Sequence, residues 1–415
     1  MSAYQNTQYQ AVDTGASGYS YANPNSYSYN VAQEQKRQNQ RSKWIVIASV
    51  AGVLALIAIG VGVGVGVAKS HKNSNTKSAA ASSSNSNTSG VVQQTDPNDP
   101  SSFVKNPALK QSFYGMAYTP YGSQLPNCNN SLAEVITDIQ LLSQLTKRIR
   151  LYGADCNQSA LVLEAIKQTK VDMKVFLGNY PIATDAGQAY ERQRDLIKDA
   201  LTTYGTDHVA GITVGNEFIL NYLTDNGGSQ QDPNGPVGNA GAALLLTNIT
   251  DTMNMVSSMN LDVPVGNADA GSYFNTQILS AVKYGMANVH PWFAAQSIQD
   301  AAGWTADFFA TTNVAAANAL SNKPTMYIAE TGWPTKSSSV EAESDGPSNA
   351  SVANLQIYLD TFVCQANANG TGYMYFEYFD EGWKDVQFGG VEGWWGLFNA
   401  DRTLKNVTIP DCAAP

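Results

Sequence analysis

Eight short apolar runs alternate with helical patterns over residues 107–415, and this alternation limits the possible folds more than any other feature of the chain. The stretches 132–145, 187–204 and 354–366 have the helical pattern. Strands joined by crossover helices form a parallel sheet, and eight of them predict a closed (β/α)8 barrel of the TIM type. The predicted strands are 112–119, 147–153, 173–180, 209–217, 262–270, 287–293, 325–331 and 372–379.

A doubly wound open sheet is the alternative fold for this pattern. It usually has fewer strands and carries a glycine-rich phosphate turn after the first of them. No GxGxxG follows any predicted strand, and the chain has neither a P-loop nor a GxSxG elbow. We therefore expect an α/β protein of the (β/α)8 barrel class over residues 107–415.

The residues before the barrel contain an apolar run, 44–68, without a single charge. About 20 such residues span a bilayer, and a cleaved signal peptide would have a shorter apolar run closer to the N-terminus. The run therefore predicts one transmembrane helix. The Tyr-, Gln-, Asn- and Ser-rich residues 1–43 predict a disordered tail, and the Ser-, Asn- and Thr-rich residues 69–106 predict a flexible stalk.

Charge and sequons indicate how the chain is oriented. Four Lys or Arg residues precede the apolar run and three follow it, which slightly favours a cytoplasmic N-terminus. All Asn-x-Ser/Thr sequons follow residue 70, so we expect the barrel to lie outside the cell, on a single-pass type II membrane protein. The sequons begin at Asn87, Asn129, Asn157, Asn248, Asn349, Asn369 and Asn406.

Composition excludes several kinds of function. Residues 101–415 hold 17 basic and 30 acidic residues, and such an acidic body repels phosphates, so we expect no nucleic-acid partner. Three scattered histidines exclude a His-rich metal site, and we expect no metal or cofactor. The four cysteines form no CxxC pair, which argues against structural zinc and leaves two disulfides in three possible connectivities.

Polar side chains stand at the carboxyl ends of the predicted strands, where the active sites of such barrels lie. Because the strands are otherwise apolar, we expect these polar residues to form a site and not a core. They are Tyr118, Tyr121, Arg150, Tyr152, Asn179, Asn216, Glu217, Asn267, Asp269, His290, Trp292, Glu330, Glu377 and Asp380.

Two of these residues, Glu217 and Glu330, end the fourth and seventh predicted strands. A single strand-end carboxylate often caps a helix or pairs with arginine, but two opposed glutamates suit glycoside hydrolysis. One gives a proton to the leaving oxygen and the other, ionised, attacks the anomeric carbon. We expect Arg150 to keep Glu330 ionised, burial and neighbouring charge to raise the pKa of Glu217, and Asn216 to bind a sugar 2-hydroxyl.

Residues 113–404 resemble glycoside hydrolase family 17, the β-1,3-glucanase family, in its fungal form. The motifs that carry the resemblance are FYGMAYTPYG, RIRLYGADC, ITVGNE, PVGNADA, NVHPWF, YIAETGWPT, FEYFDEGWKD and EGWWGLF. The combination of GNE with ETGWP at this spacing is highly specific. PVGNADA departs from the family pattern, so the resemblance implies that Asn267 alters one sugar-binding subsite.

The resemblance implies a (β/α)8 barrel and a retaining mechanism on β-1,3-glucan, with Glu217 as acid/base and Glu330 as nucleophile. It also implies an anchored enzyme that faces the cell wall and needs no cofactor; we expect a monomer. Hydrolysis and transfer to another sugar use the same residues, so a β-1,3-glucanosyltransferase stays an alternative, as does a non-catalytic glucan-binding sensor. The expected substrate-binding residues are Tyr118, Arg150, Tyr152, Asn216, Asn267, His290, Trp292, Trp333, Glu377 and Lys384.

The order of the predicted strands suggests one disulfide pairing. Cys128 follows the first strand and Cys156 the second, so both are expected on the same face of the barrel. Cys364, on the last helix, is then left to hold the C-terminal tail through Cys412.

Overall fold

The computed structural model describes residues 92–96, 98–229 and 232–415 of the chain. The predicted tail 1–43, the predicted span 44–68 and most of the predicted stalk 69–106 lie outside these residues. Within the described part, no helix is both long enough and apolar enough to cross a membrane.

Eight parallel strands close into a barrel in the spatial order β1-β10-β7-β6-β5-β4-β3-β2, which confirms the predicted (β/α)8 class. A short antiparallel pair, β8 and β9, lies in the connection after β7. The strands are β1 (Gly115–Ala117), β2 (Arg148–Arg150), β3 (Lys174–Asn179), β4 (Val209–Val214), β5 (Val265–Ala270), β6 (Tyr284–Asn288), β7 (Thr325–Thr331), β8 (Ser344–Asp345), β9 (Ser348–Asn349) and β10 (Tyr373–Tyr375).

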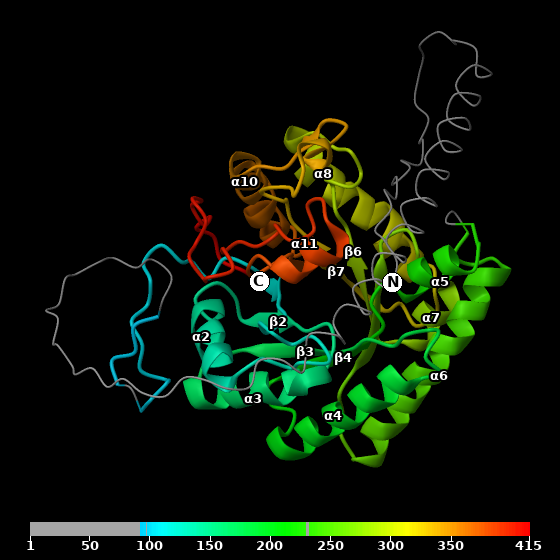
Figure 1. Ribbon diagram of the computed structural model, residues 1–415. Helices are drawn as coiled ribbons and strands as arrows, with labels where there is room; N and C mark the ends of the chain where they lie inside the picture. The colour runs from blue at the N-terminus through cyan, green and yellow to red at the C-terminus, as the bar shows by residue number, and fades with distance from the viewer. Residues whose placement is uncertain (1–91, 97, 230–231) are drawn as a thin grey trace, which may run out of the picture. The chain divides into compact units, whose positions relative to one another are not determined.

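Helices run around the outside of these strands, as Figure 1 shows for α2, α3, α4 and α6 on one side and α8 and α10 on the other. The three predicted helical stretches correspond to α2, α4 and α10. The helices are α2 (Leu132–Leu142), α3 (Gln158–Thr169), α4 (Gln188–Tyr204), α5 (Phe218–Asp225), α6 (Pro236–Ser258), α7 (Thr276–Ala281), α8 (Ile298–Phe308), α9 (Ala315–Asn318), α10 (Val352–Ala368) and α11 (Gly382–Phe388), with short turns η1 (Asp155–Asn157), η2 (Phe309–Val314) and η3 (Val340–Ala342).

The seventh strand has its predicted bounds, and the other seven barrel strands differ from the prediction at one end or at both. The sixth was predicted at 287–293 but runs from Tyr284 to Asn288, so the prediction was about three residues late at its start. The chain leaves the sheet before Pro291, which has no N–H to give to a strand ladder. The eighth was predicted at 372–379, yet β10 ends at Tyr375, and the backbone beyond it bonds to residues 395–398 as well as to the ends of β7 and β1.

The core has two layers, inside and outside the barrel. Phe176, Tyr284, Met286 and Met374 fill the interior, while a larger cluster packs between the strands and the helices. The layers follow from the alternation of side chains along each strand. On β3, for example, Phe176 points inward, whereas Val175 and Leu177 belong to the outer cluster.

The sequence predicted that the packed unit starts at Pro107, but the unit begins earlier in the chain. Gln94 and Phe103 form an antiparallel bridge. Helix α2 holds this segment, since the Gln140 side-chain amide donates to the Pro100 carbonyl at 2.7 Å. The described end of the predicted stalk is thus attached to the barrel.

Both predicted disulfides are confirmed. Cys128–Cys156 joins the loop after β1 to the loop after β2, at the carboxyl ends of the strands. Cys364–Cys412 joins α10 to the C-terminal tail. This tail lies at the opposite end of the barrel, because the Cys412 N–H donates to Ser112, which comes just before β1.

Candidate active site

Glu217 stands at the N-terminus of α5, three residues after the end of β4. Gly215, two residues earlier, has a φ of +91°, a backbone conformation that residues with a side chain rarely adopt. Glu217 itself has a φ of 54°. A non-glycine residue in this left-handed region is uncommon, and such residues cluster at functional sites. Asp269 accepts the Ile219 N–H at 2.9 Å and so fixes the first turn of α5. The VGNE motif thus forms a sharp turn that holds Glu217 at the barrel mouth.

A register shift in β7 turns Glu330 into the barrel. Ala287 of β6 pairs with Ile328, but the next residue, Asn288, pairs with Glu330, so Ala329 is an extra residue on β7. Ala329 already belongs to the interior cluster, and strict alternation would turn Glu330 outward. An extra residue of this kind re-aims the side chain that follows it. Glu330 consequently meets Arg150 inside the barrel.

The glycine of the ETGWP motif lets two strand ends approach each other. A Cβ on Gly332 would lie 2.0 Å from the Phe376 carbonyl oxygen, so no larger residue fits without moving the backbone. The contact brings the end of β7 next to Glu377, which follows β10.

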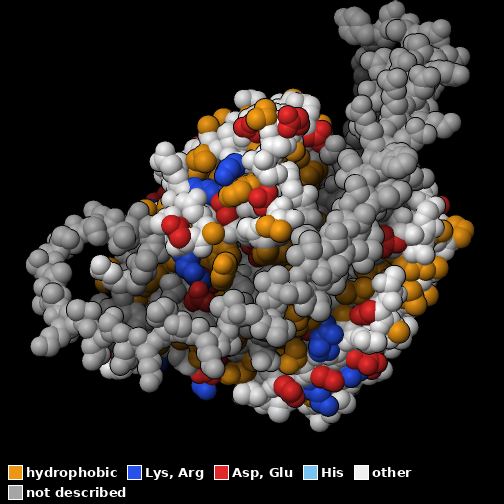
Figure 2. All heavy atoms as spheres, viewed as in Figure 1, with side chains coloured by type: hydrophobic (Ala, Val, Ile, Leu, Met, Phe, Trp, Pro, Cys, Tyr) orange, Lys and Arg blue, Asp and Glu red, His pale blue; other side chains and the backbone are white. Residues whose placement is uncertain are grey.

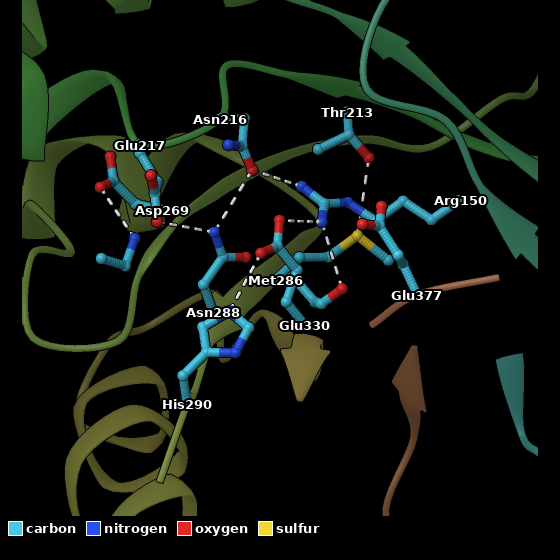
Figure 3. A network of polar contacts seen from close by, with 12 residues as sticks. Arg150, Thr213, Asn216, Glu217, Asp269, Met286, Asn288, His290, Glu330 and Glu377 are labelled. Carbon is cyan, nitrogen blue, oxygen red and sulfur yellow. Dashed lines mark hydrogen bonds and ion pairs between the residues drawn. The ribbon is translucent and has the colours of Figure 1, made fainter. Parts of the chain in front are cut away.

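A continuous line of side-chain hydrogen bonds joins Glu217 to Glu330 (Figure 3). Asn288 donates to Glu217 Oε1 at 2.9 Å and to Asn216 Oδ1 at 3.5 Å. Arg150 donates from Nη2 to Asn216 Oδ1 at 2.5 Å and from Nη1 to Glu330 Oε1 at 2.9 Å. All five side chains are buried, so the geometry between the two carboxylates is set by the protein and not by solvent.

Glu330 is held as a carboxylate. Burial opposes its ionisation, but the His290 hydrogen bond at 3.1 Å and the Arg150 charge outweigh burial and lower the pKa of Glu330 to about 2. As expected from the sequence, Arg150 is the ionic partner of Glu330. A carboxylate this acidic is fully charged at neutral pH and available as a nucleophile.

A second charged cluster lies beside this pair. Lys384 contacts Glu377 at 2.7 Å and also forms an ion pair with Glu381. Burial opposes the charge on Lys384, but the two carboxylates outweigh it and raise the pKa of the ammonium group. One ammonium cannot neutralise two acids, and burial together with the charge of Glu381 raises the pKa of Glu377 well above its ordinary value.

Two adjoining cavities open at the barrel mouth. Glu330 lines one of about 490 Å³, with Tyr152, Gln158, Lys384 and Glu392. Glu217 lines the other, of about 290 Å³, together with the α5 residues Phe218, Asn221 and Tyr222. Asn216 lines both cavities and therefore marks the boundary between them.

Glu392 is a buried carboxyl group in the larger cavity. Its side chain forms no hydrogen bond or ion pair with any other described residue. Burial raises its pKa to about 8; the Lys384 charge opposes this shift, and the nearby Glu217 and Glu330 reinforce it. At neutral pH, Glu392 is therefore a protonated acid that can donate a hydrogen bond.

The structure brings some of the predicted substrate-binding residues to the cavities and not others. Tyr152, Asn216 and Lys384 line them, as expected. His290 touches Glu330, and Glu377 is 2% exposed and bound to Lys384, so both act on neighbouring side chains. Trp292 is buried against Phe293, and its role in substrate binding stays a prediction.

Four predicted substrate-binding residues are each at most 1% exposed and bind other parts of the protein, so their contact with substrate stays a prediction. The Tyr118 hydroxyl donates to Asp138 of α2, and the Asn267 amide donates to the Val214 carbonyl, so Asn267 ties β5 to β4. Trp333 packs on Tyr358 and donates to the Asn349 carbonyl. Arg150 donates to Glu330 and Asn216.

Three residues at the site were missed by sequence analysis: Asn288, Gln158 and Glu392. Asn288 is the last residue of β6, and a correct placement of that strand would have singled it out. Gln158 begins α3 and Glu392 lies in the loop after α11, and the alternation of strands does not identify either residue. Within the described residues, no group of three or more His, Cys, Asp or Glu side chains is arranged to hold a metal ion.

Comparison with known proteins identifies the family. Residues 115–396 match the BtgE/BtgC glycoside hydrolase domain. The chain is 35% identical over 332 residues to a putative glucan endo-1,3-beta-glucosidase, btgC, of Aspergillus niger, which covers 76% of this chain and 46% of the relative. It is 35% identical over 326 residues to the glucan endo-1,3-beta-glucosidase btgC of Emericella nidulans, covering 73% and 47%. The chain thus spans just under half the length of these curated relatives.

Solved structures share the fold. An active-site mutant of Rhizomucor miehei beta-1,3-glucanosyltransferase, in complex with laminaritriose, has a TM-score of 0.56 at 23% identity and covers 73% of this chain and 99% of its own. An endo-laminarinase from Formosa has a TM-score of 0.54 at 18% identity, covering 70% and 84%. At these identities the likeness confirms the barrel fold alone.

Proposed function

The chain belongs to the BtgE/BtgC glycoside hydrolase family, and on that premise we propose that it is a retaining enzyme that cleaves internal β-1,3 bonds of glucan. One observation carries the proposal: the buried line of hydrogen bonds from Glu217 to Glu330, whose two ends face adjoining cavities. An ionised carboxylate and a second carboxyl group held in fixed relation are what a double displacement needs.

The proposed reaction has two steps. In the first, Glu330 attacks the anomeric carbon, the bond from that carbon to the leaving oxygen breaks, and Glu217 gives its proton to that oxygen. In the second, Glu217, now a carboxylate, takes a proton from water; the resulting oxygen attacks the anomeric carbon and frees Glu330. Asn216 lies between the cavities, and its oxygen is occupied by Arg150, so its N–H groups face the 2-hydroxyl of the sugar.

The proposed substrate is a β-1,3-glucan, as the names of the relatives suggest. The distribution of charge on the visible face is compatible with an uncharged ligand. On the face seen in Figure 2, acidic and basic side chains are interspersed with hydrophobic ones. The cavity of Glu330 has the ring of Tyr180 and the indole of Trp383 in its walls, and such aromatic surfaces pack against sugar rings.

Transfer to a second sugar is the alternative. In a transferase, a sugar hydroxyl and not water accepts the glycosyl group from Glu330. The cavity of Glu217 gives an acceptor sugar a place to bind, because Phe218 and Tyr222 stack there with ring centroids 6.3 Å apart. Hydrolysis and transfer are told apart by their products, since only transfer makes oligosaccharides longer than the substrate.

We also propose that the barrel is exported and that residues 44–68 anchor it in the cell membrane, with the active site facing the cell wall. Both disulfides support an oxidising compartment. Five sequon asparagines are exposed and accessible to a glycan: Asn129, Asn157, Asn349, Asn369 and Asn406. Glycosidase treatment followed by a gel shift, and protease protection of intact cells, test this topology.

The experiment that tests the activity follows defined β-1,3-oligosaccharides over time by mass spectrometry, with the full chain and three variants. We expect Glu330→Gln and Glu217→Gln each to lose at least about 1,000-fold in kcat/KM, and Glu341→Gln, an exposed control, to lose nothing. On an aryl β-1,3-oligosaccharide, whose leaving group departs without a proton, azide should rescue Glu330→Ala by giving an α-glycosyl azide and Glu217→Ala by giving a β-glycosyl azide. Normal turnover by Glu330→Gln contradicts the proposal, and binding without cleavage by the parent favours a sensor.

A further inference from the structure

A cavity of about 870 Å³ lies at the end of the barrel opposite to Glu217 and Glu330. The walls of this basal cavity come mainly from the amino ends of β4, β5, β6 and β7 and from the last turns of α6. The two cavities at the barrel mouth are smaller, at about 490 and 290 Å³. No residue that lines the basal cavity takes part in the proposed reaction, so the cavity is a candidate binding site of its own.

The floor of the basal cavity is aromatic and firmly held. Phe176 and Tyr284 are buried in the barrel interior, and the half-buried Tyr327 packs against both, with ring centroids 5.7 and 6.1 Å away. A Cβ on Gly266 would lie 2.2 Å from the Tyr284 ring, so this glycine makes room for the ring. The Tyr284 hydroxyl shares a hydrogen bond with Thr213 at 2.9 Å. Tyr327 therefore offers aromatic surface that a ligand can meet without moving it.

Polar side chains surround this floor. Two come from the end of α6, one from the loop after it, and two from the starts of β6 and β7. All five are exposed, and none of these side chains forms a hydrogen bond or an ion pair with another described residue. They are Ser257, Asn260, Asp262, Lys283 and Thr325. The rim of the basal cavity thus offers hydroxyl, amide, carboxylate and ammonium groups to a ligand.

The chemistry of the walls selects a neutral ligand with many hydroxyl groups. Asp262 and Lys283 balance each other, so a charged ligand meets no excess of opposite charge. An apolar ligand would take water from the polar rim and give it no partner in return. Sugar hydroxyls can donate to Asp262 and accept from Lys283 and Asn260, while the ring packs on Tyr327. Cavities of roughly 300–1,000 Å³ take up drug-sized molecules, which matches about two or three glucose units.

We propose that the basal cavity is a second carbohydrate-binding site, which holds a segment of β-1,3-glucan away from the catalytic mouth. The identity of the glucan rests on the proposed function, whereas the site itself uses no catalytic residue. Strand β5 has 6 residues and so spans about 20 Å, and the path between the two ends runs around a helix layer about 10 Å thick. A pentasaccharide in the mouth therefore does not reach the basal cavity, and only a polymer can occupy both sites.

The test uses the double variant Asp262→Asn/Lys283→Met, which changes two exposed side chains and keeps the net charge. The matched control is Asp172→Asn/Lys323→Met, with the same two changes at exposed positions at the same end of the barrel, outside the basal cavity. Two bound sites raise the apparent affinity for a polymer through effective concentration. We expect the site variant to lose about 3- to 10-fold in kcat/KM on insoluble β-1,3-glucan and to keep the parent value on the β-1,3-linked pentasaccharide. We expect the control to match the parent on both substrates.

Binding is measured without cleavage in the Glu330→Gln background. Calorimetric titration of the pentasaccharide should show two molecules bound per chain in this background and with the control changes added. The site variant should bind one. Tyr327→Ala, which removes the aromatic surface, should also bind one and keeps the inference testable through a second residue.

A single molecule bound per chain in the Glu330→Gln background overturns the inference and leaves the proposed function standing. So does a site variant with the parent rate on insoluble glucan, or one that loses activity equally on the polymer and on the pentasaccharide. A parent chain that cleaves no β-1,3-oligosaccharide overturns the proposed function instead. The titrations then decide the inference by themselves: loss of one bound molecule in the site variant, but not in the control, supports the basal site, and equal binding rejects it.

Discussion

The side-chain amide of Asn288 donates a 2.9 Å hydrogen bond to Glu217 Oε1 and so connects the carboxyl group after β4 to the end of β6. The same amide reaches Asn216 and, through it, Arg150 and Glu330. Asn288 is fully buried and does not line either cavity. It therefore acts through Glu217 and not on the substrate.

Replacement of Asn288 is expected to lower kcat more than it raises KM. Asn288→Ala frees the Glu217 side chain, and a misplaced acid loses part of the 10²- to 10⁴-fold that general acid catalysis supplies. We expect a loss of about 10- to 100-fold in kcat with little change in KM, measured on β-1,3-oligosaccharides. Asn399→Ala, in an exposed turn, is the matched control. An equal change in kcat for both variants contradicts the positioning role.

Replacement of His290 is expected to change the pH profile. His290 gives Glu330 a hydrogen bond that helps to lower the pKa of this carboxyl group to about 2. In His290→Ala the pKa of Glu330 rises, so activity on the acidic side is lost at a higher pH. The kcat/KM of the variant should fall several-fold further at pH 4 than at pH 7, relative to the parent.

His290→Gln offers a donor at a similar position and should restore part of the acid-side activity. The measurement is kcat/KM from about pH 3 to pH 8 for the three proteins. Profiles of identical shape would show that His290 does not control the ionisation of Glu330.

Glu392 is expected to make the protein less stable as the pH rises. Its pKa is about 8 in the folded chain, against an ordinary value of 4.5, so between these values the unfolded state releases the proton that the folded state keeps. Unfolding is thereby favoured progressively from pH 4.5 to pH 8. Glu392→Gln is neutral at every pH. Its free energy of unfolding should rise relative to that of the parent by a few kcal/mol between pH 4.5 and pH 8.

Chemical denaturation of parent and Glu392→Gln at pH 4.5, 6 and 8 measures this difference directly. The gain should be smallest at pH 4.5 and largest at pH 8. If the difference in unfolding free energy is the same at all three values, the Glu392 carboxyl group has an ordinary pKa.

Removal of the Cys364–Cys412 disulfide should cost stability and spare activity. The bridge closes a segment with a sequence separation of 48, for which the chain-entropy model gives about 4 kcal/mol. It lies at the end of the barrel opposite to Glu217 and Glu330. We expect Cys364→Ser/Cys412→Ser to unfold at lower denaturant concentration with parent kcat and KM at 25 °C.

The corresponding Cys128→Ser/Cys156→Ser variant serves as the contrast, because this disulfide borders the cavity of Glu330 and Gln158. We expect it to raise KM as well as to lower stability. Equal kinetic effects of the two double substitutions would mean that neither bridge has a specific relation to the cavity.

The sequence predicted four of the five residues in the line of hydrogen bonds from Glu217 to Glu330 and missed Asn288. Glu217 and Glu330 were identifiable because each follows an apolar strand in a distinctive motif. Asn288 was not, because the apolar run around it extends past the true strand end into 289–293. Tyr118, Asn267 and Trp333 are buried, which the sequence did not reveal, because a polar or aromatic residue at a strand end looks the same whether it faces the cavity or the helices.

The sequence by itself determined the class of fold, suggested the pairing of the cysteines and singled out the two carboxyl groups, since these predictions follow from local periodicity, motifs and the order of elements along the chain. Only the tertiary structure decided which way the side chains at the barrel mouth point. Glu330 faces inward because one extra residue in β7 shifts its pairing with β6, and Gln158 reaches the cavity because a disulfide fixes its turn. Such orientations depend on contacts between residues far apart in the chain, which no local pattern encodes.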